Sequence, residues 1–249
     1  MPSLMNNADS TLRSVCASME MEGFHVSKQT QEDCRAVLRG EKTADEIVAQ
    51  YVAAFSKKHD VYGYFTQQDD VLENKLGITD PAKMKQVEAA IVAVRTNEVL
   101  QNPPVGKMDY AYLKLLHQKL FSDIYPFAGN TRTVDIAKGG SAFCYVAFLE
   151  DEQRRIFATL QRDFCEGMSR EKFIARLVIF AADLNALHPF REGNGRTIRL
   201  FLTLLARRCG FDLSYDAVHS EEMMTADILA FQGDFSLLTE MYEQIVIEK

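Results

Sequence analysis

The apolar run FIARLVIFAADLNAL, residues 173–187, is followed directly by a histidine and a proline, and this order constrains the local fold most strongly. Proline pushes the residue before it out of the α region, so the helix expected over 173–187 ends at His188. The short loop REGNG then contains two glycines that let the backbone turn, and a second helix is expected from about Gly195. The sequence therefore predicts a helix–loop–helix over about 173–208.

Helical spacing of apolar residues recurs along most of the remaining chain. Three short helices are expected before residue 56, where Gly23 and Gly40 end the first two. Ser27 and Thr43 precede the acid-rich first turns of the second and third, as N-caps do. Such short helices have little core of their own, so we expect them to pack against the rest of the chain.

One segment departs from this helical pattern. Pro126 and Gly129 interrupt the helix. Residues 133–136 favour a strand, and residues 142–146 favour a second strand that runs back along the first. The expected β-hairpin, at about 130–146, must lie against helices, because a lone hairpin is marginal in water. The fold class predicted is mainly α with one small hairpin.

The polar segment SKKHDVYGYFTQQDD is interpreted as a linker or surface loop. It separates an N-terminal helical unit, residues 1–56, from a main unit, residues 57–218. Residues 219–249 are then expected to form a helical extension. Neither an internal repeat nor a low-complexity tract is evident in the sequence.

Composition excludes several classes of protein. The net charge of −7 leaves no global positive field for a nucleic-acid backbone, so nucleic acid is not an expected partner. No stretch reaches the ~18 uncharged apolar residues of a membrane span, and MPSLMNNADSTLR lacks a signal-peptide pattern. The five cysteines include no CxxC pair, which favours reduced thiols. We expect a cytoplasmic protein, with signal-independent export left open.

The stretch HPFREGNGRTIR, residues 188–199, concentrates residue types that are used in phosphate chemistry. His188 is its one side chain able to accept a proton near neutral pH. The N–H groups of the glycine loop and of the next helix N-terminus form a seat for anions. Arg196 and Arg199 share one face of that helix, which suits two or more phosphates.

Glu192 repels phosphate on its own, but it is a sensible Mg²⁺ ligand beside phosphate oxygens. Phe190 is interpreted as a core anchor. A loop rich in Gly, Asn and Pro also commonly does no more than connect two helices. The combination of a base, an acid, a glycine turn and two arginines in one order favours a functional site.

On these residues the chain resembles the Fic-domain proteins, whose signature is His-x-Phe-x-(Asp/Glu)-Gly-Asn-Gly-Arg-x-x-Arg, with no departure at any fixed position. The resemblance covers roughly residues 57–218 and includes IYPFAGNTR and NKLGI. It implies a Fic-type helical bundle with a hairpin flap. It also implies a protein adenylyltransferase, which transfers AMP from ATP to a Ser, Thr or Tyr hydroxyl of a target protein.

The resemblance also implies site roles and a partner surface. The flap would dock the target's backbone as an added strand. Gly195 stands where the phosphate-transferring Doc-like branch has lysine, which favours AMP transfer. The implied roles are His188 as general base, Glu192 as Mg²⁺ ligand, Gly193, Asn194 and Gly195 as the anion hole, Arg196 as the β-phosphate contact and Arg199 as the γ-phosphate contact.

Near the N-terminus, SMEMEG, residues 18–23, resembles the inhibitory Ser/Thr-x-x-x-Glu-Gly/Asn motif of this family. The segment up to about residue 55 is similar to VbhA-type antitoxins. The resemblance implies that Glu22 pairs with Arg199, where the ATP γ-phosphate would bind, and that Ser18 steadies the contact. On a helix Ser18 and Glu22 face the same way. The alternative is a helix whose Glu22 is merely solvated.

Other functions remain open at this stage. A nucleotide-binding regulatory module would bind ATP without transferring AMP. A related Fic transferase or a de-AMPylase would use the same phosphate seat. The sequence does not identify the target protein. It also leaves open whether Glu22 acts within one chain or between chains, and whether the chain forms a homo-oligomer.

Overall fold

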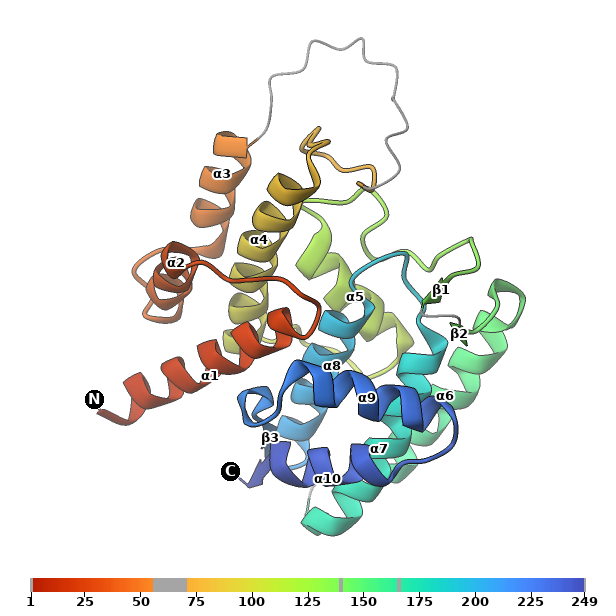
Figure 1. The fold of residues 1–249 in the computed structure, drawn as a ribbon. Coiled ribbons are helices and arrows are strands. Elements are labelled where there is room, and N and C mark those ends of the chain that lie inside the picture. The colour runs from red at the N-terminus through yellow and green to blue at the C-terminus, as the bar shows by residue number, and fades with distance from the viewer. Residues whose placement is uncertain (1, 56–70, 139–140, 165–166, 249) are drawn as a thin grey trace.

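The computed structural model describes residues 2–55, 71–138, 141–164 and 167–248, and this part of the chain is mainly helical (Figure 1). The expected linker at 56–70 lies outside the described residues. The helices are α1 (Pro2–Glu20), α2 (Lys28–Leu38), α3 (Ala44–Phe55), α4 (Pro81–Gln101), α5 (Tyr110–Phe121), α6 (Leu149–Asp163), α7 (Arg170–Leu187), α8 (Asn194–Arg208), α9 (Ser220–Phe231) and α10 (Ser236–Ile245).

The three predicted N-terminal helices are present, with α2 and α3 capped as the sequence predicts, although α1 begins at Pro2, earlier than expected. The Ser27 hydroxyl accepts a hydrogen bond from the Thr30 N–H at 3.1 Å, which caps α2. Thr43 and Glu46 form a reciprocal capping pair at the start of α3. Beyond α1, Gly23 has φ 72°, a left-handed conformation that ends the helix and turns the chain back.

Helix α4 is the centre of the N-terminal half. Helices α1, α2 and α3 all pack against it, and in Figure 1 they lie beside the yellow α4. Helices α5 and α8 also contact α4. As a result every residue from Val87 to Val94 is buried. The N-terminal helices therefore share one hydrophobic core with the rest of the chain, as expected for helices with little core of their own.

The predicted helix–loop–helix is confirmed. Helix α7 ends at Leu187, directly before His188 and Pro189, and α8 begins at Asn194. The two helices pack on each other, and α5 packs on α8 from another side. Phe190 in the loop is fully buried, so the core-anchor interpretation holds. The loop is thereby fixed between three helices.

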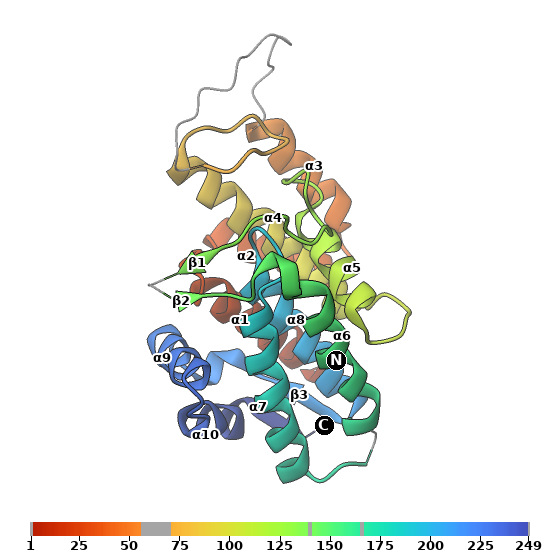
Figure 2. The same cartoon turned by 90° about the vertical axis from the view of Figure 1, so that its right-hand side faces the viewer.

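The predicted hairpin is present but shorter than expected (Figure 2). Strands β1 (Ala137–Lys138) and β2 (Ser141–Ala142) are antiparallel and pair over two residues each. The expectation of a strand over 133–136 was wrong. There the Val134 carbonyl accepts from the Arg132 side chain at 2.8 Å, and the Asp135 carboxylate accepts from the Val146 N–H at 2.7 Å. At these residues, hydrogen bonds to and from side chains take the place of the strand-to-strand hydrogen bonds of a β-hairpin.

The C-terminal segment contains the expected helices, α9 and α10, and in addition a strand that the sequence did not predict. Gly233, with φ 93°, separates α9 from α10, and α10 is followed by strand β4 (Val246–Glu248). Strand β4 pairs antiparallel with β3 (Phe211–Leu213) in a second two-stranded sheet. Two β-branched residues, Val246 and Ile247, favour this strand. Within the described ranges, no helix combines the length and apolar character that crossing a membrane requires.

Candidate active site

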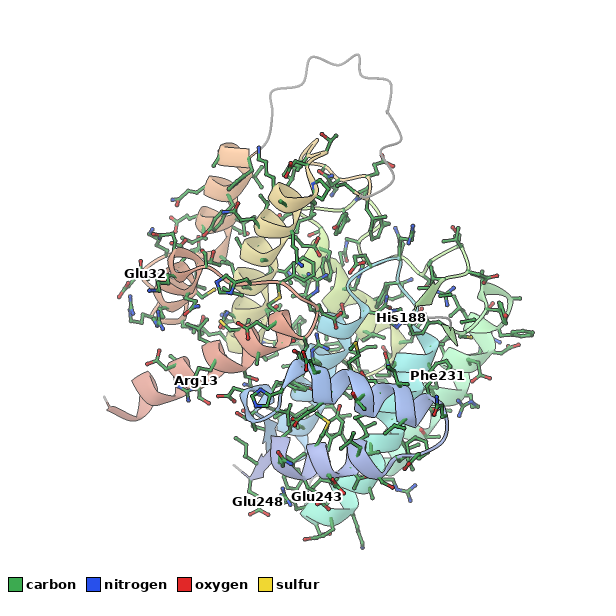
Figure 3. The ribbon with its side chains drawn as sticks, viewed as in Figure 1. Arg13, Glu32, His188, Phe231, Glu243 and Glu248 are labelled. Atoms are coloured by element: carbon green, nitrogen blue, oxygen red, sulfur yellow. The ribbon has the colours of Figure 1, made fainter. Side chains whose placement is uncertain are left out.

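The loop between α7 and α8 carries His188 in a strained position. His188 has φ 45° and ψ 60°, and no other non-glycine residue among those described has a positive φ. Its ring stacks on Phe143 with centroids 3.7 Å apart, and Figure 3 shows it beside the hairpin. Nδ1 lies 3.2 Å from the Asn185 carbonyl, which can only accept. Nδ1 therefore carries the proton, and the lone pair is on Nε2.

Gly193 of the loop lies too close to a neighbouring ring for any larger residue to fit. Gly193 has φ 77°, and a Cβ atom there would lie 2.3 Å from the Phe121 ring. The Asn194 side chain folds back onto Phe190, accepting from its N–H and donating to its carbonyl, both at 2.8 Å. The Asn194 amide thus holds the loop, and the backbone N–H groups in the first turn of α8 are the candidate seat for an anion.

Glu192 is the candidate Mg²⁺ ligand. Its Oε1 accepts from the Gly193 N–H at 2.9 Å and lies 3.2 Å from Arg196 Nη2, while 43% of the side chain is exposed. Within the described ranges, no group of three or more His, Cys, Asp or Glu residues is placed to hold a metal. A single half-exposed carboxylate fits Mg²⁺, which typically uses one or two carboxylates together with substrate phosphates.

Arg196 is buried between two aromatic rings. Its guanidinium carbon lies 4.2 Å from the Phe24 ring centroid and 4.9 Å from that of Phe121. Nη2 forms an ion pair with Glu88 at 2.6 Å. In the described part of the chain, its Nε and Nη1 atoms are buried without a hydrogen-bond partner. Unsatisfied buried donors of this kind fit an arginine that binds phosphate oxygens, since leaving them unpaired is costly.

Arg199 is bound by the N-terminal segment. Its Nη2 donates to Glu22 Oε1 at 2.9 Å and to the Ser18 carbonyl at 2.7 Å, and Nε donates to the Ser18 hydroxyl at 2.8 Å. A Cβ atom on Gly195 would lie 1.9 Å from Glu22 Oε1. The structure therefore brings Ser18, Glu22 and Arg199 together, and it places the Glu22 carboxylate over the first turn of α8.

Several residues of the site carried no recognised sequence signal. Glu88 lies among apolar residues on the buried face of α4, and a carboxylate at such a position was the available clue. Phe24 follows directly after the inhibitory motif, and Arg132 ends the quoted IYPFAGNTR. His117 of α5 is fully buried and contacts the loop at the Glu192 carbonyl, 3.0 Å from its Nε2.

Stability should depend on pH through His117. Burial lowers the pKa of its imidazole from 6.5 to about 4. Between these two values the unfolded chain binds the extra proton, so the folded state loses stability as the pH falls through this range. From about pH 7 to about pH 5 the free energy of unfolding should fall by about 2 kcal/mol through this group. Urea denaturation of wild type and His117→Gln should show a smaller fall in the variant; equal falls would contradict this assignment.

Comparisons with known proteins agree with this geometry. The family model of the Fic/DOC family matches residues 107–206, and that of the antitoxin VbhA matches residues 10–54. Among solved structures, BepC of Bartonella tribocorum with bound AMPPNP has a TM-score of 0.70 at 27% identity, over 75% of this chain and 97% of that one. The N-terminal Fic domain of a putative cell filamentation protein of Bartonella quintana with bound ADP has a TM-score of 0.71 at 28% identity, over 75% and 95%.

Curated relatives cover most of the chain. Protein adenylyltransferase VbhT of Bartonella schoenbuchensis is 37% identical over 186 residues, which are 74% of this chain and 39% of that protein. The probable protein adenylyltransferase y4lH of Sinorhizobium fredii is 36% identical over 178 residues, 71% of this chain and 91% of that protein. This chain thus spans well under half of VbhT and nearly all of y4lH.

The fold is mainly helical, and the loop after α7 and the first turn of α8 bring His188, Glu192, Arg196 and Arg199 into one region. The similarity to y4lH over nearly its whole length, together with the two family matches, shows which enzyme class this is. The chain belongs to the Fic/DOC family and is a protein adenylyltransferase with an antitoxin-like VbhA segment fused ahead of the Fic domain.

Proposed function

We propose that this chain is a self-inhibited protein adenylyltransferase, in which Glu22 blocks the binding of the ATP γ-phosphate at Arg199. One observation carries the proposal: the Glu22 carboxylate lies 2.9 Å from Arg199 Nη2 and directly over Gly195. A carboxylate there presents negative charge and acceptor oxygens, as a phosphate does. Arg199 therefore binds the protein's own carboxylate, at the first turn of α8, in place of the nucleotide's γ-phosphate.

In the released enzyme, His188 Nε2 accepts the proton of a Ser, Thr or Tyr hydroxyl of the target. The hydroxyl oxygen forms a bond to the α-phosphorus of ATP, the bond from that phosphorus to the bridging oxygen of the β-phosphate breaks, and pyrophosphate leaves with the electron pair. The AMP ester remains on the target. In the neutral imidazole, the Nδ1 contact with the Asn185 carbonyl leaves the lone pair on Nε2.

The other groups of the site bind the triphosphate. The first turn of α8 offers N–H groups to phosphate oxygens, and Arg196 and Arg199 bind the β- and γ-phosphates. Glu192 would hold Mg²⁺, which neutralises charge on the phosphates when it is bound. The target would add a strand to the two-stranded hairpin, where main-chain groups at a strand edge supply the contacts.

Mass spectrometry tests the activity directly. Glu22→Gly protein is incubated with ATP, Mg²⁺ and the proteins of a bacterial lysate, and peptides are searched for AMP on Ser, Thr or Tyr. AMP-modified peptides that disappear when ATP is omitted support the proposal. ATP binding by calorimetry without any AMP-modified peptide would instead show a nucleotide-binding regulatory module.

Phe24 adds a second contact to the inhibited state, because its ring covers the guanidinium of Arg196 at 4.2 Å. A buried cation–π contact contributes about 1–2 kcal/mol, so Phe24→Ala should raise AMP transfer by roughly 5- to 30-fold with Glu22 intact. Val26→Ala is the matched control, since Val26 is buried in the same segment at 2% exposure and has no ring to place over Arg196. An equal rise in both variants would assign the effect to looser packing.

A further inference from the structure

Arg132 is a buried arginine that the activity described so far does not use. It lies just before the hairpin, and its side chain is 0% exposed. Its guanidinium donates to the carbonyls of Val134 at 2.8 Å and of Cys144, and these two residues lie on opposite arms of the hairpin. The nearest carboxylate, on Asp135, is 3.9 Å away and 59% exposed, so it balances the buried charge only weakly.

The same guanidinium contacts the end of α7. Its Nε donates to the His188 carbonyl at 2.8 Å, and Nη2 lies 3.4 Å from the Leu187 carbonyl. Carbonyls at a helix C-terminus have no partner within the helix and carry partial negative charge. Arg132 is thus a cation at the C-terminus of the helix that ends at His188. One side chain joins both arms of the hairpin to the residue that carries the base.

Backbone hydrogen bonds run beside this junction. The Arg132 N–H donates to the Pro189 carbonyl at 2.8 Å, and the Cys144 N–H donates to the Ala186 carbonyl at 3.0 Å. These bonds attach the hairpin to the chain on either side of His188. The hairpin in turn places Phe143 against the His188 ring, with an interplanar angle of 15°.

His188 needs such support because of its backbone. A non-glycine residue in the left-handed region costs about 1–3 kcal/mol and persists where its surroundings fix it. The Arg132 Nε bond is made to the carbonyl of this residue itself. Loss of that bond would let the His188 peptide relax and move the ring relative to the hairpin.

We propose that Arg132 is a positioning residue for AMP transfer: it holds His188 and the target-docking hairpin in a fixed mutual geometry. The inference rests on the proposed function, because it takes His188 as the base and the hairpin as the docking surface. Arg132 touches neither Arg196 nor Arg199 in any hydrogen bond or ion pair of the described residues, so its loss should affect transfer and leave ATP binding alone.

Arginine is required here and lysine should not replace it. The guanidinium presents five N–H donors in a planar fork and donates to the carbonyls of Val134, Cys144 and His188, whereas a lysine ammonium is a compact point charge. Arg132→Lys keeps the charge at the α7 C-terminus but loses the geometry. Arg132→Gln also loses the charge. If geometry is what matters, the two variants should lose similar amounts of activity.

The variants are made in the Glu22→Gly protein, and the initial rate of AMP transfer from radiolabelled ATP into lysate proteins is measured against ATP concentration. Displacement of a catalytic group by ~1 Å can cost ~100-fold, so the rate at saturating ATP should fall by about that factor in Arg132→Lys. The apparent KM for ATP should change less than about twofold, since the phosphate seat is untouched.

Arg95→Lys is the matched control. Arg95 of α4 is also largely buried, at 12% exposure, and bonds to Asp123 at 2.8 Å and Asp45 at 2.7 Å, away from the site. It should lower thermal stability with little change in the transfer rate. A rate loss in Arg95→Lys equal to that in Arg132→Lys, a KM rise as large as the rate loss, or full activity in Arg132→Lys would each overturn the inference.

A second measurement separates this inference from the proposed function. In otherwise wild-type protein, Arg132→Lys should speed amide hydrogen exchange at Cys144 and shift the imidazole NMR signals of His188. Unchanged exchange and unchanged His188 signals would overturn the role of Arg132 whatever the activity. Absence of AMP transfer in the Glu22→Gly parent would count against the proposed function, and the NMR comparison would still decide whether Arg132 holds the junction.

Discussion

Glu22→Gly is expected to raise AMP transfer by ~10- to 100-fold over wild type. Removal of the carboxylate takes away one of the two acceptors of Arg199 Nη2, leaving the Ser18 carbonyl, and empties the space over Gly195, so a γ-phosphate can bind there. Couplings between a blocking group and a ligand are typically about 1–3 kcal/mol, or about 5- to 150-fold, and the expected rise lies within that range. Label from ATP carrying ³²P at the α-position, followed by electrophoresis, measures the transfer.

Two variants control this experiment. Glu20→Gly introduces the same glycine and removes the same charge, but the Glu20 side chain is 60% exposed and, within the described ranges, forms no hydrogen bond or ion pair with Arg199. It should leave transfer at the wild-type level. Glu22→Gln keeps the shape and removes the charge, so it should release the enzyme partly. If Glu22→Gly labels no more protein than Glu20→Gly does, Glu22 is not the inhibitory group.

The location of Glu22 explains how a weak contact can inhibit. Leu12, Val15 and Met19 of α1, which ends two residues before Glu22, are buried at 2% exposure or less in the common core. The helix is therefore held by hydrophobic burial, and Glu22 at its end has a high effective concentration at Arg199. Release needs only the turn after α1, residues 21–23, to move, while the buried residues of the helix remain in place. An inhibitory segment on a separate chain would have to occupy Arg199 to the same extent through its binding affinity alone.

Local sequence signals predicted the helix–loop–helix and the caps because they act over a few residues. Pro189 ends α7, Ser27 caps α2, and Gly23 ends α1, each through backbone geometry that one residue dictates. The contact of Glu22 with Arg199 was expected from a motif resemblance, since 177 positions separate the two residues and no local rule joins them.

The supporting residues could not be predicted in the same way. Glu88 meets Arg196 only because α4 and α8 pack together, and Arg132 reaches His188 across 56 positions. Strand β4 was also missed, because its partner β3 lies before α9 and α10 in the sequence. In each case the feature depends on tertiary packing that brings distant segments into contact, and a short window of sequence does not contain that information.

His188→Ala in the Glu22→Gly protein is expected to reduce AMP transfer by ~100- to 10,000-fold, the usual contribution of a general base. Alanine cannot accept the hydroxyl proton, so the attacking oxygen stays a poor nucleophile. Binding of a non-hydrolysable ATP analogue should be nearly unchanged, because the phosphate seat at α8 uses other side chains. Rapid mixing of enzyme, labelled ATP and lysate proteins gives the rate, and calorimetry gives the affinity.

His219→Ala provides the matched control for this loss. His219 is exposed at the N-cap of α9, where its backbone N–H is 3.4 Å from Glu222 Oε2, so its removal affects only a helix end. It should keep the rate of the parent within about twofold, because a lost cap costs ~1 kcal/mol of stability and leaves the site intact. Labelling that survives in His188→Ala at the level of His219→Ala would show that another group, or water, takes the proton. The stacking of Phe143 on His188 would then serve target docking alone.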